Sequence, residues 1–211
     1  MKFFKLSPRG ARRGLTALAI VLALTGLGFA AYPFVTDMWS ARIQTGLQGE
    51  FTQAGAAQRY RLGEIKTGDP LTRLEIPVLG VDTLVVEGTT PAALRAGAGH
   101  YPETPLPGEG GNVAIAGHRT TYGKPFNRID ELEPGNKVVL TTPLGRHVYQ
   151  VIAPPTVVDP YDWSPIEEFP KGGSFLTLTS CHPEGSAEYR IVVRAKLIES
   201  SEDVAERGKS T

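Results

Sequence analysis

Residues 175–183 read Phe-Leu-Thr-Leu-Thr-Ser-Cys-His-Pro, and this stretch decides how the rest of the chain is interpreted. Residues 176–179 within it alternate between apolar and hydroxyl side chains, which is the period-two pattern of a β-strand. His182-Pro183 then ends the strand, because proline cannot donate to a sheet ladder. Cys181 is the single cysteine of the chain, and a thiol at an exposed strand end is well placed to react.

Short strand-like segments recur on both sides of this stretch, beginning after Gly68-Asp69-Pro70. Turn signals such as Pro134-Gly135-Asn136 separate them, and this spacing favours an all-β sandwich or small barrel over alternating β and α units. Two short helices are predicted over residues 91–96 and 125–132, the second from apolar Phe126, Ile129 and Leu132 at helical spacing. The predicted strands are residues 74–78, 83–87, 112–117, 137–141, 147–152, 156–159, 175–180 and 190–198.

The first 35 residues differ from the rest of the chain in charge and composition. Residues 1–13 carry five basic residues and no acid, and residues 14–35 carry no charge at all. A helix of this length spans about 33 Å, enough for a hydrocarbon core of roughly 30 Å. The basic flank predicts a cytoplasmic amino terminus and a single-pass type II protein with its remaining residues outside. A cleaved signal peptide is the alternative, although the apolar run is longer than a usual signal core.

The remaining boundaries follow from composition. Residues 36–72 are expected to form an extracellular stalk without a sustained apolar face, residues 73–199 the β domain, and residues 200–211 a polar tail. The 22 Lys and Arg residues balance the 22 Asp and Glu residues. That balance argues against a basic nucleic-acid binder, so no nucleic-acid partner is expected.

A nucleophilic thiol needs a histidine and a donor for the developing oxyanion. His118 is the favoured base, because it follows the predicted strand 112–117, whereas His100, His147 and His182 have ready structural explanations. Arg190 begins the next strand after Cys181, and that register can bring its guanidinium close to the thiol. Three carboxylates are candidates to orient His118, and the sequence selects none of Asp130, Asp159 and Asp162.

Two loops are unusually long for a compact β domain, residues 97–111 and 160–173. The second carries four large apolar side chains that either wall an apolar groove or pin the loop to the domain: Tyr161, Trp163, Ile166 and Phe169. No metal-ligand pattern is present, and no cofactor is expected.

The strings Ala116-Gly117-His118-Arg119 and Thr177-Leu178-Thr179-Ser180-Cys181, followed by Arg190, resemble the sortases, the membrane-anchored cysteine transpeptidases of Gram-positive bacteria. The longer string from Gly117 to Gly123 is most similar to class E sortases of actinobacteria. Ser180 departs from the family's threonine, keeping the hydroxyl and losing a methyl.

The resemblance implies a closed eight-stranded β-barrel of sortase type, with short helices and a preceding transmembrane helix. It implies Cys181, His118 and Arg190 as the catalytic residues. We expect the substrate to be bound by Thr179 and Ser180 and, on the hypothesis that loop 160–173 walls the groove, by Tyr161, Trp163 and Ile166. The implied substrate is an LAXTG or LPXTG sorting signal, cleaved after Thr through a thioester. The implied acceptor is the stem-peptide amine of the peptidoglycan precursor lipid II, and the implied location is the cytoplasmic membrane. The protein is expected to be monomeric.

Two alternatives stay open from the sequence. A pilin-polymerising sortase shares the same catalytic residues and uses a pilin lysine as acceptor. In a membrane-tethered binding module, by contrast, Cys181 is a buried core residue, and thiol reactivity separates this class from an enzyme.

Overall fold

The computed structural model describes residues 8–167 and 172–202. The chain divides into two compact units, with the boundary between Val35 and Thr36. Helix α1 (Pro8–Phe51) contributes to both units.

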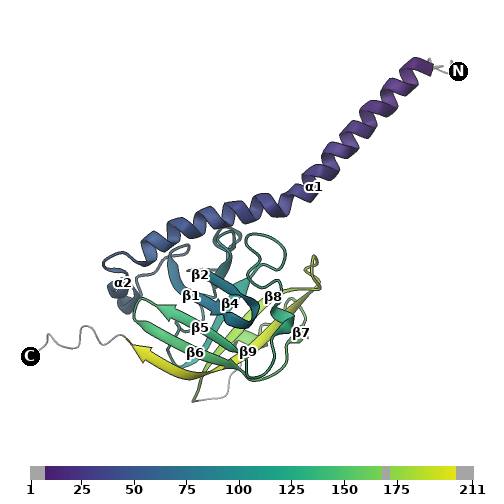
Figure 1. Cartoon of the computed structure of the whole chain (residues 1–211). Coiled ribbons are helices and arrows are strands. Elements are labelled where there is room, and N and C mark those ends of the chain that lie inside the picture. Colours follow the sequence, from purple (N-terminus) through teal and green to yellow (C-terminus); the bar gives the residue numbers. More distant parts are fainter. Residues whose placement is uncertain (1–7, 168–171, 203–211) are drawn as a thin grey trace, which may run out of the picture. The chain divides into compact units, whose positions relative to one another are not determined.

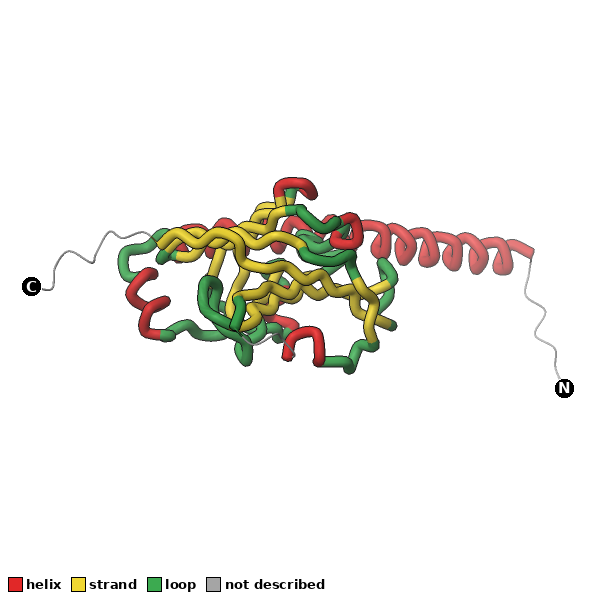
Figure 2. The backbone as a smooth tube through the Cα atoms, turned by 90° about the horizontal axis from the view of Figure 1, so that it is seen from below, coloured by secondary structure: helices red, strands yellow, loops and turns green. Residues whose placement is uncertain are grey.

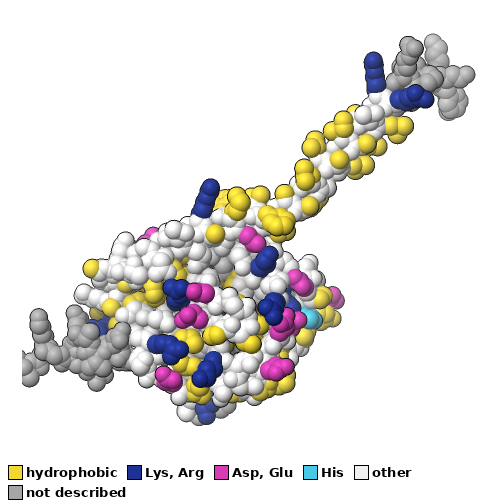
Figure 3. All heavy atoms as spheres, in the orientation of Figure 1, with side chains coloured by type: hydrophobic (Ala, Val, Ile, Leu, Met, Phe, Trp, Pro, Cys, Tyr) yellow, Lys and Arg dark blue, Asp and Glu magenta, His cyan; other side chains and the backbone are white. Residues whose placement is uncertain are grey.

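The first unit consists of the apolar part of α1. This is the one helix among the described residues that is long and apolar enough to cross a membrane by length and composition. The most apolar part of this helix is not buried within the structure, and Figure 3 shows that hydrophobic side chains cover it. Exposed leucines in such density are costly in water, which agrees with a lipid environment.

The second unit is a closed β-barrel. Eight strands form the ring in the order β6-β5-β1-β2-β3-β4-β8-β9, and pairing of β6 with β9 closes it (Figures 1 and 2). This confirms the predicted eight-stranded barrel. The ring strands are β1 (Pro70–Ile76), β2 (Val81–Glu87), β3 (Ala98–His100), β4 (Gly111–Gly117), β5 (Lys137–Thr142), β6 (Gly145–Val151), β8 (Ser174–His182) and β9 (Tyr189–Glu202).

The predicted number of ring strands is correct, but one predicted strand lies outside the ring and one ring strand was not predicted. The short strand β3 lies at the start of the predicted loop 97–111, where its Ala-Gly-His sequence gives no β-branched signal. It is held in the ring by parallel pairing to β2 and antiparallel pairing to β4. The segment predicted as strand 156–159 is β7 (Thr156–Val158), which pairs with β9 and adds a ninth strand outside the ring.

The helices are shorter than predicted. α3 (Pro91–Leu94) begins where expected, with the Thr90 hydroxyl accepting from the Ala93 N–H as an N-cap. The predicted helix 125–132 is mostly turns with the 3-10 segment η2 (Ile129–Glu131), although its three apolar residues are buried as the spacing indicated. The other short elements are α2 (Ala56–Leu62), η1 (Pro77–Leu79) and α4 (Ser164–Glu167).

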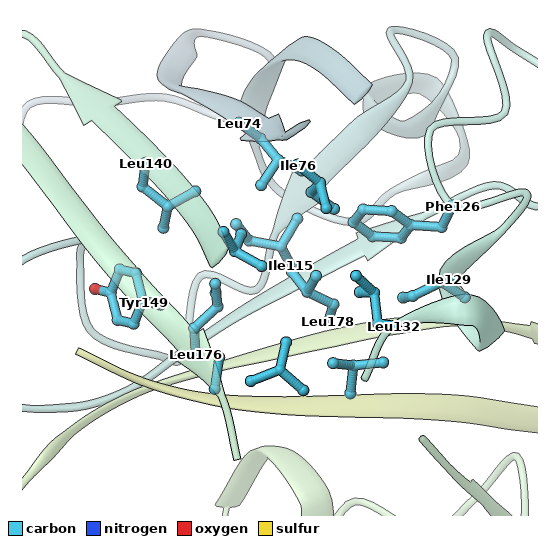
Figure 4. Close-up of a cluster of buried hydrophobic side chains, with 14 of the residues drawn as sticks. Leu74, Ile76, Ile115, Phe126, Ile129, Leu132, Leu140, Tyr149, Leu176 and Leu178 are labelled. Carbon is cyan, nitrogen blue, oxygen red and sulfur yellow. The ribbon is translucent and has the colours of Figure 1, made fainter. Parts of the chain in front are cut away.

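The barrel interior is filled by aliphatic side chains that alternate along the strands. Leu176 and Leu178 of β8 meet Ile115 of β4 and Leu140 of β5 inside the barrel (Figure 4). Each fully buried leucine contributes about 1.5–3 kcal/mol relative to an exposed one. The intervening Thr177 is also buried, and its hydroxyl donates to Asn112 Oδ1 and the Pro165 carbonyl. The residues between β7 and β8 therefore cover the outer face of β8.

Residues 36–51, expected to be part of a stalk without an apolar face, are instead the second half of α1. Their Ile43, Leu47 and Phe51, spaced by four, pack against Leu84, Val86, Ala93 and Ala96 of the barrel unit. The helix runs through Gly46 and Gly49 without a break. Packing against the barrel outweighs the cost of about 1 kcal/mol for each glycine within a helix.

Candidate active site

The parallel pairing of β4 with β8 brings His118 to Cys181. Ala116 lies opposite Thr179 at the end of the ladder, and extending that register by two residues places His118 beside Cys181. The Ser180 hydroxyl donates to the Gly117 carbonyl at 2.8 Å, which ties the two chain segments together just before both side chains. The ends of parallel strands meet at one edge, so two residues far apart in sequence share one rim of the barrel.

The antiparallel pairing of β8 with β9 brings Arg190 to the same place. Cys181 and Arg190 are direct cross-strand partners, and such partners project from the same face of the sheet. The Arg190 Nη1 donates to the carbonyls of Ala187 and Tyr189, each at 3.0 Å. The turn before β9 thus holds the guanidinium close to the barrel rim.

A cavity of about 380 Å³ gathers the predicted residues at this rim. Its lining includes every described residue proposed from the sequence as catalytic or substrate-binding: Cys181, His118, Arg190, Thr179, Ser180, Tyr161, Trp163 and Ile166. Phe169, the fourth predicted groove residue, lies outside the described residues. No described residue of segment 36–72 is among the residues that line this cavity.

The aromatic wall of the cavity is largely open to solvent. The side chains of Tyr161 and Trp163 are 83% and 52% exposed. Tyr101 supports this wall, because its ring meets Trp163 edge-on at 6.3 Å and its hydroxyl lies 3.1 Å from the Thr179 hydroxyl. Exposed aromatic rings around a polar reactive group are typical of a surface that binds an extended peptide.

His118 is half-buried against the ring of Tyr122, with 5.2 Å between ring centroids. The three carboxylates considered as its partners have other contacts: Asp130 pairs with Arg119 at 2.6 Å, Asp159 accepts from the Tyr161 N–H and Asp162 accepts from the Ser164 N–H. Among the described residues no carboxylate pairs with His118. Burial without a compensating charge lowers the pKa of His118 below its usual value.

The other three histidines have structural contacts. His100 is buried with Nδ1 2.9 Å from a Glu87 oxygen. His147 is buried with Nδ1 2.9 Å from the Ser200 hydroxyl, and His182 Nδ1 lies 3.5 Å from Arg119 Nη1. Of the four, His118 alone lines the cavity beside Cys181.

We expect His118 to titrate below about pH 6.5, because desolvation disfavours its imidazolium form. The pKa is lower in the folded than in the unfolded state, so below the unfolded pKa the unfolded state binds more protons. Stability from this group is therefore present above the unfolded pKa and is lost as pH falls through the folded pKa. NMR titration of the His118 ring, assigned with His118→Gln, measures this. A midpoint above 6.5 contradicts the neutral resting state and indicates an imidazolium paired with a thiolate.

Sequence reasoning missed the role of Arg119 beneath the site. Its side chain is only 5% exposed, and it donates to the Asn127 carbonyl at 2.9 Å and approaches the Cys181 carbonyl at 3.5 Å. With its ion pair to Asp130, it links the loop after β4 to the end of β8. Arg119 is buried whereas the Asp130 carboxylate is about half exposed, so the contacts of Arg119 connect the two segments below the rim and reach solvent at Asp130. The only signal in the sequence is the position of Arg119 directly after His118 in the string from Ala116 to Arg119, which was assigned no role of its own.

No group of three or more His, Cys, Asp and Glu side chains in the described part of the chain is arranged to hold a metal ion. The cavity at this rim presents a thiol, an imidazole and a guanidinium, which are the components of cysteine-dependent acyl transfer.

Comparison with known proteins agrees with this geometry. The sortase domain family model matches residues 74–198, which is more than half of the chain. The chain belongs to the sortase family, whose members are cysteine transpeptidases.

The relatives include sortases of class E. The chain is 35% identical over 150 residues to sortase SrtE1 of Streptomyces coelicolor, covering 65% of this chain and 43% of that protein. The chain thus spans less than half the length of that curated relative. A crystal structure of S. coelicolor sortase E1 with a tripeptide in its active site has a TM-score of 0.61 at 34% identity, over 67% of this chain and 96% of that one.

A sortase of another class is similarly close in fold. The Clostridium perfringens sortase D5 transpeptidase matches with a TM-score of 0.65 at 29% identity, over 77% of this chain and 99% of that one.

Proposed function

We propose that this protein is a membrane-anchored transpeptidase that joins secreted surface proteins to the cell wall. The observation that carries the proposal is the shared cavity that holds Cys181, His118 and Arg190 beside an exposed aromatic wall. These residues come from three different strand ends, and the parallel and antiparallel registers of β8 bring them together.

The first half of the reaction forms a thioester. His118 accepts the proton of the Cys181 thiol, and the thiolate attacks the carbonyl carbon of Thr in the sorting signal. Arg190 stabilises the oxyanion that develops on the carbonyl oxygen. The intermediate collapses as the bond between Thr and Gly breaks, and the proton on His118 passes to the leaving Gly amine.

The second half releases the product. An acceptor amine attacks the thioester carbonyl, and His118 takes a proton from that amine. The Cys181 sulfur leaves and recovers its proton from His118, so the free enzyme is restored with no net proton change. A neutral His118 at rest suits this cycle, since the imidazole must first act as a base.

The sorting signal is proposed to be of the LAXTG or LPXTG type, and the acceptor to be a stem-peptide amine of a peptidoglycan precursor such as lipid II. The tripeptide seen in the active site of the S. coelicolor relative supports a peptide substrate. The apolar part of α1 and the basic residues before it support a type II anchor with the barrel outside the cytoplasmic membrane.

The function is tested with the full chain in detergent micelles, incubated with LAXTG and LPXTG peptides with and without a diaminopimelate-containing peptide or oligoglycine. We expect cleavage after Thr, with the acceptor attached to the new carboxyl end only when acceptor is supplied. Mass spectrometry of the products identifies the preferred signal and amine. Absence of cleavage together with a Cys181 that resists alkylation in the folded protein contradicts the proposal and favours a binding module.

A further inference from the structure

The second half of α1 contacts the loop that carries His118. Residues 118–124 connect the end of β4 to the turns before η2. The Gly123 N–H donates to Asp37 Oδ1 at 2.9 Å, and Lys124 Nζ lies 3.2 Å from Asp37 Oδ2. The Tyr122 N–H approaches the Thr36 hydroxyl at 3.5 Å. Two adjacent residues of the helix therefore bind the tip of the loop.

The loop tip has a conformation that needs such support. Tyr122, Gly123 and Lys124 have consecutive positive φ angles of 53°, 75° and 37°. Non-glycine residues rarely adopt this left-handed region, because their Cβ atoms crowd the backbone. Such a conformation persists when the surrounding structure over-determines it. Asp37 and Thr36 contribute contacts to two of these three residues, beside the bond from the Lys124 N–H to the Thr121 carbonyl within the loop.

The helix half that supplies these contacts is itself fixed to the barrel. The Gln44 side-chain amide donates to the Leu84 carbonyl and accepts from the Leu84 N–H, both at 2.8 Å, as a neighbouring strand would. The Ser40 hydroxyl donates to the Ala96 carbonyl at 3.0 Å. Thr36, Ser40 and Leu47 are all buried on this face. Asp37 is therefore held at a set position relative to β2 and to the loop.

The contacts lead to the active site through Tyr122. Its ring packs on the His118 ring, so the backbone conformation that Asp37 stabilises also sets the position of the ring that shields His118. We infer that Asp37 is a positioning residue for His118, acting through Gly123 and Tyr122, so that the segment expected to be a passive stalk takes part in catalysis. The expected effect on kcat rests on the proposed function, whereas the expected effect on the position of His118 does not.

The test compares Asp37→Ala, Asp37→Asn and Glu50→Ala in the full chain in detergent micelles. Glu50 is a matched control, because it is an exposed carboxylate on the same helix and makes no contact with residues 118–124. Rates are expressed per folded molecule, quantified for each variant by circular dichroism, because iodoacetamide also reacts with the thiol of an unfolded chain. Asparagine keeps one oxygen that can accept from the Gly123 N–H, and it replaces the charged oxygen that pairs with Lys124 by an NH2 group.

For Asp37→Ala we expect kcat for peptide cleavage to fall roughly tenfold, since small displacements of a catalytic group are costly. KM should stay within about twofold, because the groove walls are unchanged. Asp37→Asn should retain at least about a third of kcat, because it preserves the contact with Gly123. Equal kcat per folded molecule in Asp37→Ala and Glu50→Ala overturns the inference.

The second readout needs no substrate. In Asp37→Ala the NMR titration midpoint of His118 should rise toward about 6.5, because a displaced Tyr122 ring admits water. The titratable and charged groups around His118 are Cys181, Arg190, Tyr161 and Asp162 across the cavity, with Arg119, Tyr122 and Lys124 in its own loop. The variant replaces none of these side chains, but it removes the ion-pair partner of Lys124. An unchanged midpoint overturns the inference. Failure of the wild type to cleave any peptide contradicts only the proposed function.

Discussion

Replacing Cys181 by alanine will abolish both cleavage and transfer of a sorting peptide while leaving the fold intact. The proposed reaction passes through a thioester on this sulfur, and the cavity holds no other thiol. We expect turnover to fall by at least about 10⁴-fold, to the level that binding and the remaining donors alone provide. Intact-mass analysis of the wild type after mixing with peptide should show an acyl adduct, and the alanine variant should show none.

Stability provides the control for that experiment. Cys181 is half-buried at the rim, not inside the aliphatic core, so removing its sulfur should cost only about 1 kcal/mol. Circular dichroism and thermal unfolding of both proteins check this. Leu178→Ala, three residues earlier on β8, is the matched contrast, because Leu178 is fully buried and its truncation should cost about 2–5 kcal/mol. Retained turnover in Cys181→Ala would end the cysteine mechanism.

The barrel was predictable where local patterns were strong. β8 alternates apolar and hydroxyl residues, and its apolar side chains fill the core as expected. β3 was not, because three residues without β-branched side chains acquire strand geometry only from β2 and β4 on either side. The ring order and the parallel β4–β8 pairing are likewise long-range properties, and residue spacing along the chain does not encode them.

The sequence predicts the catalytic residues of the candidate site but not the residues that hold them in place. Cys181 and His118 each follow a recognisable strand, and Arg190 begins one, so their types and positions were sufficient to select them. Arg119 was left without a role, because its importance depends on Asp130 and Asn127, which become its neighbours only in the folded loop. No single segment could reveal such a cluster.

The second half of α1 shows the same limit. Its apolar residues Ile43, Leu47 and Phe51 form a narrow stripe that polar neighbours obscure in the sequence. Part of its attachment is polar, because Gln44 and Ser40 bond to main-chain groups of the barrel. Hydrophobic periodicity does not detect contacts of that kind, so a segment that supports the loop after β4 has the composition of a linker.

Replacing Arg190 by lysine will reduce kcat/KM by about 10²–10³-fold although the charge is kept, because guanidinium and ammonium groups differ in geometry. In the described residues the acceptors of Arg190 are two carbonyls of its own turn, both bound by Nη1. The fork can hold these with one nitrogen and present Nη2 or Nε to a substrate oxygen. A lysine ammonium has a single nitrogen for both tasks and a shorter reach.

Steady-state kinetics of the two proteins with the preferred sorting peptide measure this loss, and the rate of Cys181 alkylation provides the control. The alkylation rate should change by less than about threefold, because the thiol keeps a cation nearby in either variant. Arg194→Lys is the matched substitution, since Arg194 lies on the same strand opposite Thr177, away from the cavity lining. If Arg190→Lys retained normal turnover, the turn carbonyls of Ala187 and Tyr189 would be the reason for an arginine at this position, and oxyanion stabilisation would fall to main-chain donors at the rim.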